Sequence, residues 1–377
     1  MKVLITFLTY GEDVFGGVER SLFNLCRGLS LSGAKVVIFT SSEFMGGGIH
    51  DEVVVITSNH LRGRFDAPMG PDFDIALMEH YRCSKLEVEN ELRIILRRES
   101  PDYVLVVDQL WGILPFLDVW ECITCPVGLW VHMPHNPDFM SIIGSMPIVD
   151  YWCVTPEIRF FVADAGGVPF DRIHILPNSI PLSDYKQCQT QRTPGRVFSN
   201  ARISPEKGTL LLLDAFALVK SRMPSARLDL CGGGFHFGFD ASYFDEVNRK
   251  IESEACLKNS VRILGVLRWN EVRQHLGAAS VAVIASNIES FPMSALEAMA
   301  SGTPLVSTCV GNLDRLASQC ARLVPPQDIN ALADALLEVL RCPEQSIEMG
   351  RAGQARVASY DSVEVASDFI KMAGRNR

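Results

Sequence analysis

Short apolar runs alternate with segments of helical periodicity along most of the chain. This alternation predicts an α/β protein with parallel sheets, because parallel strands need crossover connections, which are usually helices. It occurs in two series. The first predicts strands near 2–8, 35–40, 53–57, 103–107, 126–131 and 149–154, and helices near 18–32, 84–99 and 156–165. The second predicts strands near 196–199, 226–231, 261–264, 281–285, 304–307 and 321–324, and helices near 208–222, 241–255, 269–277, 293–300 and 328–341.

The segment between the two series is polar and rich in proline, which is typical of a linker. We therefore predict two doubly wound α/β domains, residues 1–178 and 195–358, joined by an interdomain linker at 179–194 and facing each other across a cleft. In such sheets ligands bind beyond the carboxyl ends of the strands. The loops that follow the strands are therefore where chemistry is expected.

Length and composition exclude several classes of protein. A chain of 377 residues can form two cores, and its 47% hydrophobic fraction and mean hydropathy of +0.15 exclude disorder. The most apolar long stretch, Tyr103–Trp120, contains Asp108, Pro115 and Asp118, so it is unsuited to span a membrane. The N-terminal apolar run ends before Gly11, which is too early for a secretory signal.

Cysteine usage and charge indicate the compartment and the partners. Eleven cysteines, mostly inside apolar runs, are typical of reduced residues in a cytoplasmic protein. The net charge of -9 argues against a nucleic-acid partner. Residues 1–180 carry 13 basic and 23 acidic side chains, so a broad polybasic membrane face is not indicated there. A local patch of Arg93, Arg97 and Arg98 on one predicted helix leaves weak peripheral membrane association open.

Gly16 and Gly17 follow the first strand and open the first helix. Glycines there let a ligand approach the backbone, and the helix N-terminus favours an anion or a sugar hydroxyl; the alternative is a simple flexible turn. Their spacing from Gly11 misses the G-x-G-x-x-G fingerprint, and the second strand ends without a ribose-binding acid. A nicotinamide enzyme is thereby disfavoured.

His132 follows an apolar strand and is expected to face the cleft, where it can donate a hydrogen bond to a sugar or a phosphate. The alternative is a structural loop histidine. Cys122 and Cys125 imitate part of a zinc site with it. The extended strand between Cys125 and His132, at about 3.3 Å per residue, places these two residues some 20 Å apart. No metal site is therefore predicted.

Arg202 and Lys207 lie five residues apart in a loop before a helix of the second domain. A guanidinium fork and an ammonium point charge at such a place form a clamp for a phosphate or diphosphate. The alternative is a solvated turn in which Glu206 forms an internal salt bridge.

Glu289 and Glu297 lie eight residues apart around the start of a predicted helix. Carboxylates accept pairs of hydroxyl hydrogen bonds, so these two are candidates to hold a hexose and a ribose. The backbone N–H groups around Phe291 to Ser294, a range that includes Pro292 and Met293, are placed to face a phosphate. Without other motifs, a simple surface pair is the alternative.

Taken together, these motifs resemble the family 4 glycosyltransferases, which have the GT-B fold of two Rossmann-like domains. The most specific part is the run from Glu289 to Pro304, Glu-Ser-Phe-Pro-Met-Ser-Ala-Leu-Glu-Ala-Met-Ala-Ser-Gly-Thr-Pro. Further motifs agree in order: Gly16-Gly17-Val18-Glu19, Ile175-Leu176-Pro177-Asn178, Arg202-Ile203-Ser204-Pro205-Glu206-Lys207-Gly208, Gly232-Gly233-Gly234, Val261-Arg262-Ile263-Leu264-Gly265 and Leu323-Val324-Pro325-Pro326-Gln327-Asp328.

The resemblance implies transfer of a sugar, with retention of anomeric configuration, from a UDP- or GDP-linked donor to an acceptor hydroxyl. It implies no metal and no other cofactor. Arg202 and Lys207 would neutralise the departing diphosphate, an electrostatic effect that can supply most of the catalysis. The remaining roles it implies are the donor hexose for Glu289 and His132, the ribose for Glu297, and the base for the backbone of Gly265, Val266 and Leu267.

Some positions depart from the family pattern. Ala201 stands where glycine usually precedes the arginine, and Val310-Gly311-Asn312-Leu313-Asp314 replaces the usual double glycine and glutamate. Asparagine tolerates positive φ, so we expect this turn to survive. The resemblance also assigns residues 359–377 to a C-terminal helix that packs back on the N-terminal domain.

Two rivals to a transferase remain at this point. A nucleotide-sugar epimerase or hydrolase of the same fold would turn over the donor without an acceptor. A catalytically silent sugar-nucleotide-binding protein would need no phosphate clamp, and the intact Arg202 and Lys207 weigh against it. The expected acceptor is a polysaccharide, a lipid-linked glycan or a small molecule.

Overall fold

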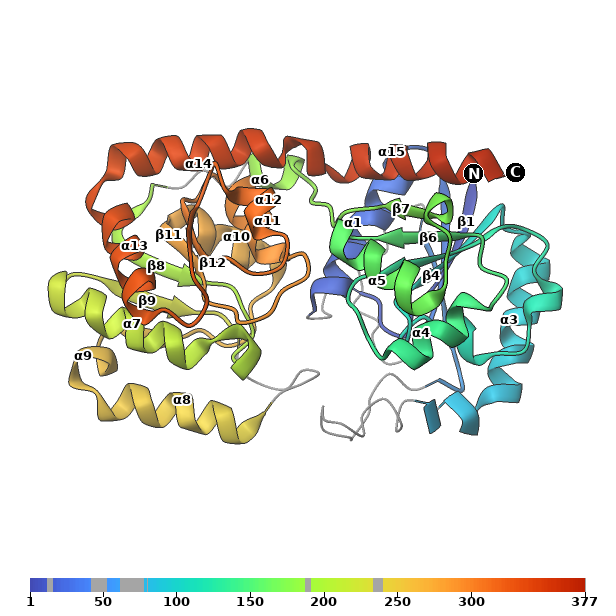
Figure 1. The fold of residues 1–377 in the computed structure, drawn as a ribbon, viewed down its shortest axis with the longest axis horizontal. Helices are drawn as coiled ribbons and strands as arrows, with labels where there is room; N and C mark the ends of the chain where they lie inside the picture. Colours follow the sequence, from blue (N-terminus) through green and yellow to red (C-terminus); the bar gives the residue numbers. More distant parts are fainter. Residues whose placement is uncertain are drawn as a thin grey trace. The chain divides into compact units, whose positions relative to one another are not determined.

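The computed structural model describes residues 1–11, 16–41, 53–61, 78–79, 81–186, 191–232 and 240–376. The chain divides into two compact units (Figure 1). The first comprises Met1–Ser179 and Tyr360–Arg377, and the second comprises Ile180–Ser359. Each unit is built around one parallel sheet with helices, which confirms the predicted fold class.

The sheet of the first unit has seven parallel strands in the order β3-β2-β1-β4-β5-β6-β7. These strands are β1 (Lys2–Thr6), β2 (Lys35–Ser41), β3 (Val53–Ser58), β4 (Tyr103–Val107), β5 (Val127–Val131), β6 (Asp150–Cys153) and β7 (Ile173–Ile175). The helices include α1 (Gly17–Leu31), α3 (Lys85–Glu99), α4 (Pro137–Gly144), α5 (Pro156–Gly166) and α15 (Ser362–Ala373). The strand order reverses between β1 and β4, where doubly wound sheets bind ligands.

Helix α15 packs along α1, although the two are more than 300 residues apart in sequence (Figure 1). The packing is close at Gly28, where an added Cβ would lie 2.0 Å from the backbone oxygen of Ser362. Phe369 of α15 lies 5.5 Å from the ring of Tyr103 and 5.0 Å from that of Trp152, between centroids. The C-terminal segment is therefore part of the first unit's core.

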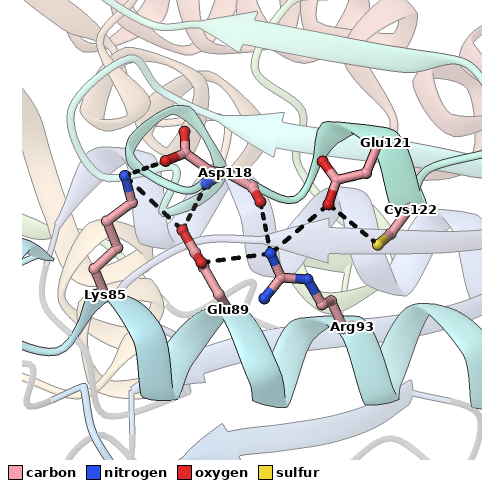
Figure 2. A network of polar contacts seen from close by, with 6 residues as sticks. All are labelled: Lys85, Glu89, Arg93, Asp118, Glu121 and Cys122. Atoms are coloured by element: carbon pink, nitrogen blue, oxygen red, sulfur yellow. Dashed lines mark hydrogen bonds and ion pairs between the residues drawn. The ribbon is translucent and has the colours of Figure 1, made fainter.

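A network of polar contacts fixes the loop after β4 to helix α3 (Figure 2). Glu89, only 3% exposed, accepts a hydrogen bond from the backbone N–H of Asp118 at 2.7 Å. Its carboxylate lies 3.9 Å from Lys85 Nζ and 3.5 Å from Arg93 Nη2. Arg93 also donates to the carbonyl of Asp118, while Lys85 pairs with its carboxylate at 2.6 Å. Glu89 is thus the centre of this clasp.

Replacing Glu89 with leucine is expected to destabilise the protein by about 2 to 3 kcal/mol, because a half-buried backbone N–H loses its acceptor and two cations each lose one of their partners. Glu87, exposed on the same helix, is the matched control, and its replacement with leucine should change stability by less than about 0.5 kcal/mol. Urea unfolding followed by tryptophan fluorescence measures both. Equal midpoints for the two variants would show that the clasp does not stabilise the fold.

The sheet of the second unit has six parallel strands in the order β10-β9-β8-β11-β12-β13. They are β8 (Thr193–Ser199), β9 (Arg227–Leu230), β10 (Val261–Ile263), β11 (Ala279–Ile284), β12 (Leu305–Thr308) and β13 (Arg322–Val324). The helices are α6 (Ser183–Lys186), α7 (Thr209–Arg222), α8 (Ala241–Ser253), α9 (Ala255–Lys258), α10 (Trp269–Ala278), α11 (Met293–Ala300), α12 (Leu313–Ala317), α13 (Ile329–Arg341) and α14 (Pro343–Val357).

Strand β8 begins at Thr193, inside the segment predicted to be a linker. Pro194 cannot donate a ladder hydrogen bond and is normally excluded from central strands. Here it precedes the pairing with β9, which starts at Arg196, and it lies beside an irregularity in the register between β8 and β11. The proline therefore breaks no regular pairing.

The part of the chain that the structure describes contains no helix that is both long and apolar enough to cross a membrane.

Candidate functional site

Lys207 and Glu289 meet at the carboxyl edge of the second unit's sheet. Lys207 ends a short 3-10 helix after β8, and Glu289 lies in the loop after β11. The Nζ of Lys207 donates to Glu289 Oε1 at 2.7 Å, and the hydroxyl of Ser286 donates to the same oxygen at 2.7 Å. The fold thus brings together two residues that the sequence analysis assigned to different parts of a donor.

Arg202 lies in the same loop as Lys207 and is half-buried. Its Nη2 is 3.2 Å from Glu206 Oε1, so the internal salt bridge weighed as the alternative is present. The pair is open to solvent, with about a third of each side chain exposed (35% and 40%), and such pairs are worth little energy. Its presence therefore does not prevent Arg202 from turning to a phosphate.

Glu297 lies on α11 and is only 2% exposed. Its Oε2 accepts a hydrogen bond from Asn200 Nδ2 at 2.5 Å. Asn200 follows β8 and is not among the site residues predicted from the sequence. The pairing, across 97 residues of chain, had no signal in the sequence, although the asparagine stands beside the Arg202 motif.

Two glycines of the second unit hold backbone conformations that other residues rarely adopt. Gly208, with φ 65°, is the N-cap of α7, and an added Cβ would lie 2.1 Å from the carbonyl oxygen of Ala285. Gly265, with φ 74°, accepts a hydrogen bond from the N–H of Gly232 at 2.8 Å. No described atom lies within 4 Å of its missing Cβ. The half-buried segment Gly265, Val266 and Leu267 is therefore open beside Gly265.

Helix α11 begins at Met293, and within the described chain no side chain caps it. Phe291 and Met293 are each 7% exposed, and Pro292 occupies the N-cap position. The first N–H groups of such a helix have no acceptor within the helix and can donate to a ligand. This end of α11 is where the sequence analysis expected a phosphate.

The Gly311-Asn312 turn is formed, but asparagine does not adopt the positive φ expected of it. The positive φ of 59° falls on Gly311, where an added Cβ would lie 2.4 Å from the carbonyl oxygen of Glu289. Asn312 has φ -90° and its N–H donates to the carbonyl of Ser290 at 3.2 Å. Asparagine is therefore accepted because only the first of the two positions needs glycine.

In the first unit, polar side chains gather after β4 and β5. His132 is 4% exposed, and its Nε2 has no hydrogen-bond partner in the described part of the chain. Burial lowers the pKa of His132 to about 4. The charge of Asp108 raises this pKa and that of His135 lowers it, and both effects are smaller than that of burial. The imidazole is therefore neutral near pH 7, which lets it donate to or accept from a hydroxyl.

Asp108 and His135 form a pair beside His132 that the sequence analysis did not identify. His135 Nε2 lies 3.0 Å from Asp108 Oδ1, and Asp108 is 2% exposed. Although burial opposes it, the interaction with His135 holds the pKa of Asp108 below its usual value. Asp108 also has φ 63°, a strained conformation that clusters at functional sites.

Gly16 is the N-cap of α1, with extended backbone (φ -167°), and Gly17 is the first residue of the helix. An added Cβ at Gly16 would meet the carboxylate of Glu19 at 1.8 Å, whereas none of the described atoms lies within 4 Å of that position at Gly17. The Glu19 carboxylate also accepts from Thr9 Oγ1 at 3.0 Å. A negative charge already lies here, so this helix end favours a hydroxyl over an anion.

Each unit thus presents a different chemistry at the carboxyl edge of its own sheet. The second offers two cations, two carboxylates and an uncapped helix end, a set that suits a phosphorylated, hydroxyl-rich ligand. The first offers a neutral imidazole and a carboxylate and histidine pair.

Comparisons with known proteins add independent findings. The family described as Glycosyl transferases group 1 matches residues 185–356. A D-inositol 3-phosphate glycosyltransferase of Pseudarthrobacter chlorophenolicus is 32% identical over 380 residues, which cover 92% of this chain and 87% of that protein. A trehalose synthase of Pyrococcus horikoshii is 29% identical, with 87% and 86% covered. Among solved structures, the sucrose-phosphate synthase of Thermosynechococcus elongatus shares the fold with a TM-score of 0.80 at 18% identity, covering 99% of this chain and 98% of that one.

Proposed function

Because the chain belongs to the group 1 glycosyl transferases, of the family 4 type with the GT-B fold, we propose that it transfers a sugar from a nucleotide-diphosphate donor to an acceptor hydroxyl with retention of anomeric configuration. The observation that carries this proposal is the contact between Lys207 and Glu289 at the carboxyl edge of the second sheet. It joins a group suited to phosphate to a group suited to sugar hydroxyls.

Lys207 can reach a phosphate without leaving Glu289. An ammonium group has three N–H donors, and Glu289 takes one of them. Glu289 Oε1 already accepts two hydrogen bonds, while its Oε2 has no partner among the described residues and is left for a donor hydroxyl. One ion pair therefore sets the distance between the phosphate and the sugar.

In the reaction, the bond between the anomeric carbon and the diphosphate oxygen breaks, and the acceptor oxygen bonds to the same carbon. The proton of the acceptor hydroxyl goes to the departing diphosphate. Arg202 and Lys207 offset the charge that develops on this leaving group, and fixed cations near such a charge commonly supply several kcal/mol. No metal is required by this proposal. Neutral His132 is assigned to a hydroxyl of the sugar that moves.

Glu297 is assigned to the ribose of the donor, and Asn200 holds its carboxylate in place. The backbone of Gly265, Val266 and Leu267, which is open beside Gly265, is assigned to the base. The N-terminus of α11, around Phe291, Pro292 and Met293, is assigned to the phosphates. A cytoplasmic location is supported by Cys26, Cys153 and Cys320, which are buried as thiols.

A thermal-shift panel of UDP, GDP, ADP and TDP sugars tests the donor assignment. One nucleotide class should raise the melting temperature, because a ligand at a hundredfold excess over its Kd stabilises the fold by about 2.7 kcal/mol. The shift should be the same with EDTA. NMR of the product formed with that donor should show the donor's anomeric configuration. Donor turnover without an acceptor would instead support the epimerase or hydrolase, and no shift with any nucleotide would contradict the proposal.

A further inference from the structure

A buried carboxylate joins three neighbouring strands of the second unit. Asp229 lies in β9 and is 0% exposed. Arg196 of β8 donates to it through Nε at 2.7 Å. Arg262 of β10 donates to both of its oxygens, through Nε at 2.7 Å and Nη2 at 2.9 Å. Burial opposes ionisation, but the hydrogen bonds from Arg262 and Arg196 keep the pKa of Asp229 below its usual value, so it is charged.

This carboxylate is connected to both ends of the segment assigned to the donor base. Arg262 stands three residues before Gly265, so its pairing with Asp229 holds the end of β10 that leads into this segment. Beyond the segment, helix α10 carries His275, whose Nδ1 lies 2.7 Å from Arg196 Nη2. Arg196 is in turn paired with Asp229, so the helix that follows the segment is also linked to this carboxylate.

Stability alone does not account for this arrangement. Buried ion clusters are often no more stabilising than apolar residues of similar size, because each charge must lose its water. β9 ends at Leu230, and two residues later Gly232 donates its N–H to the carbonyl of Gly265. Asp229 thus lies next to the place where the base segment is also held by backbone hydrogen bonding. The cluster is placed to define one loop conformation.

We propose that Asp229 is a positioning residue for donor recognition: through Arg262 on one side and through Arg196 and His275 on the other, it holds the backbone of Gly265 to Leu267 in the shape that receives the base. This inference rests on the proposed function, because it presumes that the segment contacts a nucleotide.

The link to α10 exists only while His275 is neutral. Arginine has no acceptor, so Nδ1 of His275 must accept the hydrogen bond and carries no proton. The charged groups around His275 are Arg196, Asp229, Arg262 and Glu271. Burial, followed by the charge of Arg196, lowers the pKa of His275 below its ordinary value. As the pH falls through that pKa, the imidazolium faces Arg196 as a like charge, and donor affinity should fall with it.

Calorimetric titration with UDP-glucose, GDP-mannose and ADP-glucose tests the inference. Asp229→Asn should weaken binding of the donor that the wild type prefers by about tenfold and reduce the preference among the three, since a displaced backbone loses contacts to the base. Arg262→Lys, a milder change at an exposed side chain, should act in the same direction. Leu336→Ala, at a buried position of α13, is the control for lost stability.

Unchanged donor affinity and preference in Asp229→Asn, with a melting temperature lowered as in Leu336→Ala, would show a purely structural role and overturn the inference while leaving the proposed function intact. A wild type that binds no nucleotide sugar of the thermal-shift panel would overturn both. The second arm is pH. As the pH is lowered from 7.5 through the range below 6.5, wild-type affinity for the preferred nucleotide sugar should fall, whereas the affinity of His275→Asn, whose side-chain oxygen accepts from Arg196 without titrating, should be nearly constant. Parallel profiles would contradict the role of His275.

Discussion

Lys207→Ala should lower kcat/KM for sugar transfer by about a thousandfold, the largest effect expected of any single change in this protein. The ammonium lies 2.7 Å from Glu289 and still has donors for a phosphate. Its loss removes a fixed positive charge from the leaving group and leaves the Glu289 carboxylate, with only 10% of its side chain exposed, with Ser286 as a neutral partner. Both consequences oppose transfer. Initial rates with the preferred donor, at saturating acceptor, measure the effect.

A control separates loss of charge from loss of structure. Lys258 forms an equally close pair with Glu252, at 2.8 Å, on an exposed part of the same unit. Lys258→Ala should leave the rate within about twofold, because exposed pairs contribute little. Lys207→Arg keeps the charge and should recover part of the activity. If Lys207→Ala is folded, as judged by circular dichroism, and transfers sugar at the wild-type rate, the clamp assignment is wrong.

Acid should destabilise the first unit through His132. Its pKa is about 4 in the folded protein and near 6.5 when unfolded, so the unfolded chain binds more protons between these values. The contribution is fully present above pH 6.5 and decreases as the pH falls toward 4. A difference of this size corresponds to about 3 kcal/mol, a large share of ordinary domain stability.

Urea unfolding at several pH values measures this, because four of the five tryptophans lie in residues 1–179 and report mainly on the first unit. His132→Asn removes the titrating group, so its stability should depend less steeply on pH between 6.5 and 4 than that of the wild type. The two proteins are compared by the slope of the unfolding free energy against pH. This removes any pH-independent destabilisation caused by the substitution, and it removes the contribution of His275, which titrates in both proteins. Identical slopes would show that His132 is not held neutral by burial.

Local patterns in the sequence predicted the regular elements well where those elements are long or strongly apolar. The strand at 103–107 and the helix at 293–300 have the predicted bounds. Strand β7 was missed because three residues, Ile173–Ile175, are too few for a periodic signal. Helix α14 was missed although Pro343 marks its start, because its polar surface gives weak periodicity.

The sequence predicted individual residues of the candidate site from the motif in each loop. It did not predict which of those side chains contact each other. Glu289 and Lys207 belong to separate motifs, and their pairing follows from the order of β8 and β11 in the sheet. The pair of Asp108 and His135 could not be predicted, since Asp108 interrupts an apolar run and its partner is 27 residues away. Side-chain pairing of this kind is decided by tertiary structure rather than by spacing along the chain.

The membership of α15 in the first unit has a consequence for the order of events on the ribosome. Residues 180–359 are contiguous, so the second unit can fold as soon as they have emerged. The first unit begins earlier but must wait for Phe369 to cover Tyr103 and Trp152. At about 5 to 20 residues per second, roughly 10 to 40 seconds separate the exit of residue 179 from that of residue 360. During this interval the nascent chain exposes an apolar surface on its first unit, a surface suited to a chaperone.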